Sequence, residues 1–201
     1  MPTLKNGRLT VQILDPDEDR ARLGSRYCTG GYIWQVLDAA GAPLLTGPQW
    51  PEARPDVFHG QGAPEAFNSY PGAEEVPEGG PVLVIGVGSV RRTSAEQPFQ
   101  PRHNREVIQF LDWKVETASD TVSMRAEHVF GRWRYRLQKR TFLSGSTVRS
   151  ATVLSNVGET VLPARWFAHP FFPIPGQARL FRANLPLGVP ESLGFTMDSD
   201  E

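Results

Sequence analysis

Glycine and proline interrupt this chain so often that long helices have no room to form. The 201 residues include 19 glycines and 18 prolines. Proline removes a backbone donor from a helix, and glycine weakens any regular element in which it stands. Between these breaks, β-branched and aromatic residues gather in short runs, which are typical of strands. The sequence therefore predicts a mainly β protein.

The second half of the chain has the clearest strand pattern. Short turns separate five runs of strand-forming residues, at 105–117, 121–130, 133–143, 147–156 and 161–172. Because connections this short join neighbouring antiparallel strands, we expect the five runs to form an antiparallel meander.

Residues 133–138 alternate strictly between apolar and polar side chains. Trp133, Tyr135 and Leu137 alternate with two arginines and a glutamine. A period of two predicts a strand with one buried and one polar face. We interpret the arginines as part of a solvated sheet face in preference to a ligand site.

The first half of the chain is less regular. Residues 8–14 and 30–38 resemble strands, with a turn at 38–43, and residues 81–90 read as one buried strand. The proline- and glycine-rich stretch 46–81 is too long for an ordinary connection. It is interpreted as a lid, a binding loop or a disordered insert.

Composition limits the classes of function. Lysine and arginine number 21 against 22 aspartates and glutamates, so no net charge favours nucleic acid or an anionic membrane as a partner. No apolar run reaches the length of a membrane span or a signal peptide, which predicts a cytoplasmic location. The lone cysteine, Cys28, is expected to be a buried structural thiol. One domain over residues 1–201 is the simplest organisation.

Common metal and nucleotide motifs are absent from the sequence. The four histidines lack the spacing of zinc ligands, and "GVGSV" at 86–90 lacks both the lysine of a P-loop and the third glycine of a dinucleotide-binding turn. We expect neither a metal nor another cofactor.

Three stretches, at 58–70, 86–104 and 162–176, combine aromatic residues with histidine, arginine or glutamate. This combination suits a sugar, because the C–H face of the ring packs on an aromatic side chain while charged groups bind the hydroxyls. A small-molecule sugar is therefore the expected ligand.

The segment "SNVGETVLPARWFAHPFFP" at 155–173 resembles the galactose mutarotase, or aldose 1-epimerase, superfamily. In that family a strand beginning Asn-x-Gly runs to a His-Pro-Tyr/Phe-Phe signature. The segment "GSRYCTGGYIWQVLDAAGAPLL" at 24–45 is similar to the family's early strands, and the resemblance extends over residues 8–175. It implies an all-β fold, an antiparallel β supersandwich of the galactose mutarotase type with a sugar-binding cleft on its concave face.

The resemblance also implies a reaction, the interconversion of the anomers of a free sugar by acid/base catalysis. His169 matches the histidine of the signature and would be the general acid. Without this context, a histidine on an apolar strand is more often a satisfied core residue, and this alternative stays open. Four residues lie where substrate contacts are expected: Glu65, Arg92, His103 and Phe171.

The chain departs from the family at its carboxyl end. The catalytic base of the epimerases is a glutamate near that end, whereas this chain ends soon after His169. The fold is therefore expected to lack C-terminal strands, with Glu191 or Glu201 as substitutes for the base. Three explanations are open: the chain is truncated, it is completed by another subunit in a homo-oligomer, or it is a carbohydrate-binding module without turnover. A structural or assembly β-sandwich is the alternative from another class.

Overall fold

Antiparallel strands make up nearly all the regular structure of residues 1–173, the part of the chain that the computed structural model describes. Helical structure in this range is limited to three short 3-10 segments, and none of them is long and apolar enough to cross a membrane. The prediction of a mainly β protein is confirmed. The elements in order are β1 (Thr3–Lys5), β2 (Leu9–Ile13), η1 (Arg20–Arg22), β3 (Ile33–Asp38), β4 (Glu65–Phe67), η2 (Ala73–Glu75), β5 (Pro81–Val84), β6 (Gly88–Arg91), η3 (Pro101–His103), β7 (Val107–Phe110), β8 (Lys114–Thr117), β9 (Thr121–Phe130), β10 (Trp133–Ser144), β11 (Thr147–Asn156) and β12 (Trp166–Ala168).

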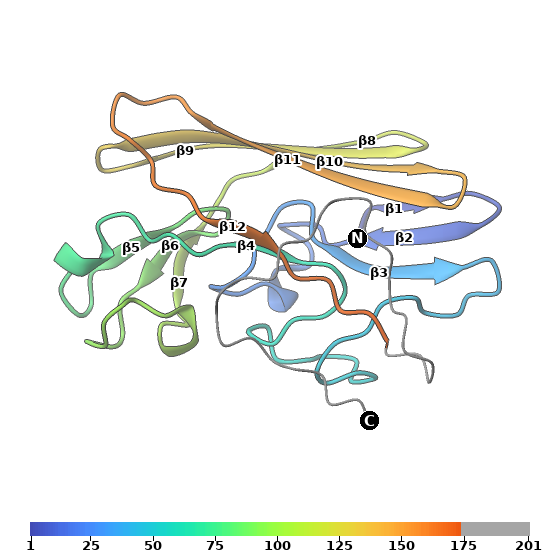
Figure 1. Cartoon of the computed structure of the whole chain (residues 1–201), viewed down its shortest axis with the longest axis horizontal. Helices are drawn as coiled ribbons and strands as arrows, with labels where there is room; N and C mark the ends of the chain where they lie inside the picture. The colour runs from blue at the N-terminus through green and yellow to red at the C-terminus, as the bar shows by residue number, and fades with distance from the viewer. Residues whose placement is uncertain (174–201) are drawn as a thin grey trace, which may run out of the picture.

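The longest strands form one four-stranded sheet in the order β11-β10-β9-β8. All three pairings are antiparallel between consecutive strands, so the predicted meander is confirmed for this part of the chain. Tight turns at Gly131 and Gly145, both with positive φ, join β9 to β10 and β10 to β11. This sheet is the upper layer of the molecule in Figure 1.

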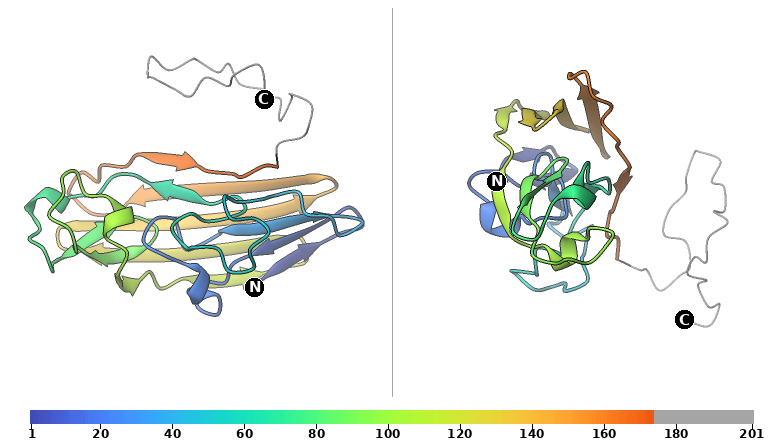
Figure 2. Two further views of the ribbon diagram at one scale, coloured as in Figure 1. Left: turned by 90° about the horizontal axis from the view of Figure 1, so that it is seen from below. Right: turned by 90° about the vertical axis from the view of Figure 1, so that its left-hand side faces the viewer.

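Shorter sheets form the opposite layer. Two of them are three-stranded, with the orders β1-β2-β3 and β5-β6-β7, and the third is the antiparallel pair β12-β4. The end-on view in Figure 2 shows the long sheet on one side and the short sheets on the other. The arrangement is that of a β-sandwich.

The main core fills the space between the two layers. Inward side chains of β9 and β10 alternate with outward ones, so Trp133, Tyr135 and Leu137 are buried while Arg134 is exposed, as the period of two predicts. Each fully buried large apolar side chain contributes roughly 1.5–3 kcal/mol to folding. Cys28 is buried in the same core, as expected, and burial raises the pKa of its thiol. The side chains that share this core with β9 and β10 include Leu4, Val11, Ile13, Leu83, Leu111 and Trp113.

Two predicted strands are each divided in the structure. The run 105–117 breaks between β7 and β8, because the chain crosses there from the lower to the upper layer while Leu111 and Trp113 fill the core. The run 81–90 folds as a hairpin of β5 and β6, because Gly86 and Gly88 both have positive φ and allow a turn inside an apolar run.

The last run of the predicted meander pairs elsewhere. Only Trp166–Ala168 of the run 161–172 forms a strand, and it pairs with β4 in the opposite layer instead of with β11. The prolines at 163, 170 and 173 limit the strand's length, because proline cannot donate to a ladder. The stretch 46–81 supplies the pairing partner β4 and also contains η2.

Candidate functional site

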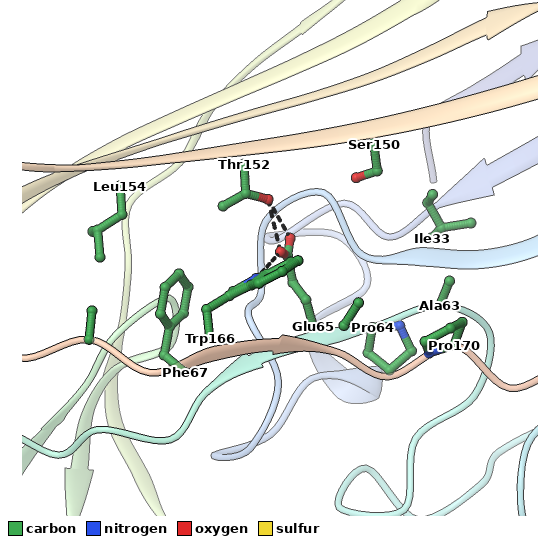
Figure 3. A pocket seen from close by; sticks show the side chains of 12 residues that line it. Ile33, Ala63, Pro64, Glu65, Phe67, Ser150, Thr152, Leu154, Trp166 and Pro170 are labelled. Carbon is green, nitrogen blue, oxygen red and sulfur yellow. Dashed lines mark hydrogen bonds between the residues drawn. The ribbon is translucent and has the colours of Figure 1, made fainter. Parts of the chain in front are cut away.

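A cavity of about 440 Å³ lies between β11 of the upper sheet and the β4–β12 pair (Figure 3). This size falls in the range of small-molecule sites. We call this cavity the Glu65 pocket, because the carboxylate of Glu65 is the one charged group that lines it within residues 1–173. Its lining residues are Ile33, Ala63, Pro64, Glu65, Phe67, Ser150, Thr152, Leu154, Ala164, Trp166, Ala168 and Pro170.

Strand alternation decides which side chains reach the pocket. Every second residue of β11, from Ser150 to Leu154, faces it, and Figure 3 shows these side chains directed toward β4 and β12. Across the gap, β4 and β12 pair so that Phe67 stands opposite Trp166 and Glu65 opposite Ala168. Directly opposite residues of a sheet share a face. The register therefore places both pairs on the pocket wall.

Polar contacts concentrate on the carboxylate of Glu65. The Thr152 hydroxyl lies 2.9 and 2.8 Å from its two oxygens, and the Trp166 indole N–H donates to Oε2. The Lys139 ammonium is in direct contact with Oε1 and also donates to the Thr152 hydroxyl over 2.8 Å. Strands β4, β10, β11 and β12 therefore converge on one hydrogen-bonded group.

Lys139 is the deepest member of this group. Its side chain is 1 % exposed and that of Glu65 is 10 % exposed. Burial lowers the pKa of the Lys139 ammonium, because a charge removed from water is disfavoured. Contact with the carboxylate offsets that cost, since a buried charge is tolerated when it is paired and hydrogen-bonded. The polar end of the pocket thus joins a cation and an anion without net charge.

Aromatic and aliphatic side chains form the rest of the wall. Trp166 is 51 % exposed although its indole N–H is bonded to Glu65, so its ring remains accessible. Phe67 is buried beside it. The pocket thus presents an accessible aromatic ring next to a fixed carboxylate and the Ser150 and Thr152 hydroxyls. A ligand with an apolar face and several hydroxyl donors matches this arrangement.

His169 and Phe171 lie on the opposite side of this sheet from the Glu65 pocket. The two rings are 4.7 Å apart, and His169 also contacts the rings of Tyr27 and Phe167. Phe167, His169 and Phe171 therefore share one face, as alternation along an extended chain requires. Burial lowers the pKa of His169, and the nearby Arg26 charge acts in the same direction. Near neutral pH the imidazole is therefore mainly uncharged.

The other predicted contact residues lie away from the pocket. Arg92 is 2 % exposed, and its guanidinium donates to the backbone carbonyls of Ala73, Val76, Ser94, Ala95 and Glu96. This geometry fixes a loop. His103, in η3, lies against the Glu96 carboxylate and accepts from Arg102 Nε. Of the five predicted site residues, only Glu65 lines the pocket. Glu191 and Glu201 lie outside the described residues.

The sequence pattern does not point to Thr152 and Trp166, which line the pocket, or to Lys139, which contacts Glu65 from the core. The signal for Lys139 is its position, because it stands two residues after Leu137 on the apolar face of β10. A charge at a buried position of an alternating strand indicates a buried partner. Nothing in the sequence names that partner, since Glu65 comes from a distant irregular stretch.

The side chains around the Glu65 pocket do not form a metal site within residues 1–173. Within residues 1–173, no three histidine, cysteine, aspartate or glutamate side chains gather so that they could hold a metal ion. The Lys139 ammonium moreover occupies the side of Glu65 where a cation would bind.

Comparison of the chain with models of protein families, with curated proteins and with solved structures finds no match. Functional arguments for this protein therefore depend on the chemistry of its own residues.

Proposed function

We propose that this protein binds a neutral sugar in the Glu65 pocket. The observation that supports this proposal is a buried carboxylate, neutralised by Lys139 and oriented by Thr152, beside the accessible ring of Trp166. Sugar hydroxyls are donors for carboxylate oxygens, and the apolar C–H face of a pyranose packs on an aromatic ring.

Charge favours a neutral ligand over an ionised one. The carboxylate and the ammonium cancel each other, so an anion would meet Glu65 and a cation would compete with Lys139. A polyol can instead donate to Glu65 and exchange hydrogen bonds with Ser150 without disturbing the ion pair. The proposed ligand class is therefore an uncharged monosaccharide or the uncharged end of a larger sugar.

Binding without turnover is the form of this function that the geometry supports best. His169, the general acid implied by the resemblance to the galactose mutarotase type, faces away from the pocket across β12, and its pKa is lowered. A general acid works best with a pKa near the working pH. Anomer interconversion by this chain, and the supersandwich fold of that family, stay predictions.

Titration of the protein with glucose, galactose and mannose, followed by NMR chemical shifts, tests the proposal. The decisive variant is Trp166→Ala, which removes an exposed ring and leaves the Glu65–Lys139 pair in place. Loss of one aromatic contact, worth about 0.5–1.5 kcal/mol, should weaken binding of the preferred sugar by about three- to tenfold. Trp50→Ala is the matched control, because Trp50 is 41 % exposed and does not line the pocket.

Unchanged affinity in Trp166→Ala, or equal weakening in both variants, would overturn the assignment of the sugar to this pocket. Polarimetry of freshly dissolved α-glucose and α-galactose separates binding from catalysis. Faster mutarotation that disappears in His169→Ala would support the epimerase reaction, whereas shifts without acceleration support the binding function.

A further inference from the structure

The outer face of the β8–β11 sheet carries an excess of positive charge. Its side chains alternate with those directed into the core, so every second residue of each strand faces outward. Figure 1 shows this face at the top of the molecule, with no described segment over it. Six cations and two carboxylates stand at outward positions: Lys114, Arg125, Arg134, Arg136, Arg140 and Arg149, with Glu116 and Glu127.

One part of this face is neutralised internally. The Glu127 carboxylate accepts from Arg134 over 3.0 and 2.6 Å and from Arg136 over 3.2 Å. The two guanidinium groups lower the pKa of Glu127. These arginines belong to the solvated sheet face that the sequence predicts, and the structure adds their pairing with Glu127.

A second part of the face is not neutralised in this way. Lys114, Arg125 and Arg140 line a shallow hollow of about 510 Å³ together with Gln138, Ser123 and Glu116. None of these three cations forms an ion pair with another residue of the described range 1–173. The hollow thus keeps a net positive charge even when Glu116 is counted.

Strand register makes this clustering unfavourable for the sheet itself. Lys114 pairs directly with Arg125, and Arg125 pairs with Gln138, which places Arg140 on the diagonal. Directly opposite residues have Cβ atoms roughly 4.5–5.5 Å apart, and like charges in that position are destabilising. An anion held between the three cations would remove the repulsion.

We propose that this hollow, named the Arg125 site by its central residue, binds the phosphate group of a small molecule. Guanidinium groups match phosphate oxygens with paired N–H donors, and the Gln138 amide and Ser123 hydroxyl add neutral donors at the same place. The Glu116 carboxylate and the apolar Ala151 and Val153 also line the hollow, next to the three cations.

The Arg125 site does not depend on the proposed sugar function. It lies on the outer face of the sheet, whereas the Glu65 pocket lies against the inner face, where Ser150 and Thr152 alternate with Ala151 and Val153. Backbone separates the two, so each can fail without the other.

The test is an NMR titration of the whole chain with inorganic phosphate and with pyrophosphate, at ionic strength held constant with sodium chloride. Amide shifts should saturate around Arg125, Gln138 and Arg140. Because each variant removes a charge-assisted hydrogen bond, Arg125→Gln or Arg140→Gln should weaken pyrophosphate binding by about tenfold or more. Arg134→Gln, on the same face but paired with Glu127, should leave binding unchanged.

Three outcomes would overturn the proposal. One is the absence of saturable shifts with both probes, and another is equal weakening by Arg125→Gln and Arg134→Gln. The third is tight binding of heparin or an oligonucleotide by a protein that binds neither phosphate nor pyrophosphate, which would mark the face as a polyanion surface. All three variants replace exposed side chains, so loss of the fold is not expected to obscure the result.

Discussion

Removal of one partner of the Glu65–Lys139 pair should destabilise the protein far more than removal of both. The Lys139 side chain is 1 % exposed, so Glu65→Leu leaves an ammonium ion in the core without its carboxylate. An uncompensated buried charge of this kind costs about 3–5 kcal/mol, which is a large part of the roughly 5–15 kcal/mol that stabilises a domain. For a chain of this length we expect the melting temperature to fall by about 6–20 °C.

The double variant Lys139→Met/Glu65→Leu should recover most of that loss. It removes both charges and fills the space with apolar side chains of similar size, an exchange that is often neutral or stabilising. Urea unfolding of the four proteins, followed by tryptophan fluorescence and circular dichroism, gives the coupling free energy from the double-mutant cycle. We expect the two single changes together to cost several kcal/mol more than the double change.

An exposed ion pair provides the control for this cycle. Arg134→Met removes a partner of Glu127, but both side chains are partly exposed to water, so the cost should stay within about 0–1 kcal/mol. The reasoning would be refuted if Lys139→Met and Glu65→Leu each cost no more than Arg134→Met. It would equally be refuted if the double variant lost the sum of the two single effects, because the charges would then act independently.

Two further predictions concern pH and one glycine. Burial lowers the pKa of His128 and His169 in the folded protein below the value of about 6.5 in the unfolded chain. The stability that depends on their uncharged form is therefore complete above about pH 6.5. It is lost as the pH falls from there toward the folded pKa. Urea midpoints measured between about pH 7.5 and pH 5 should therefore decrease with acidification, and His169→Phe should reduce this slope; an unchanged slope would contradict the prediction. Gly62→Ala should lower the melting temperature more than Gly131→Ala. Both glycines have positive φ, so the backbone strain is similar in the two variants. A Cβ at position 62 would lie 2.4 Å from the carbonyl oxygens of Ile33 and Trp34, whereas no atom lies within 4 Å of a Cβ at position 131. The strain from positive φ, common to both positions, is about 1–3 kcal/mol. Equal melting temperatures of the two variants would contradict the prediction.

The candidate site was only partly predictable. The sequence predicts Glu65 as a substrate contact because the stretch 58–70 combines aromatic residues with histidine and glutamate, and the structure places Glu65 in the pocket. The resemblance points to His169 as the working group, yet Trp166 lines the pocket and His169 faces the other way. Alternation indicates that neighbouring residues face opposite sides, but it does not say which side holds the cavity. Pairing with β4 decides that.

The sequence by itself determined the class of the fold and three strands of the long sheet, β9, β10 and β11. Dense glycine and proline exclude long helices, and residues 121–156 combine a period of two with tight turns, so local geometry alone specifies an antiparallel meander. Only the tertiary structure decided that β12 joins β4 instead of β11, and that Lys139 meets Glu65. Contacts between distant segments depend on the packing of whole layers. The sequence position of Lys139 shows that this buried charge needs a partner, but it carries no information about which carboxylate the fold will bring to it.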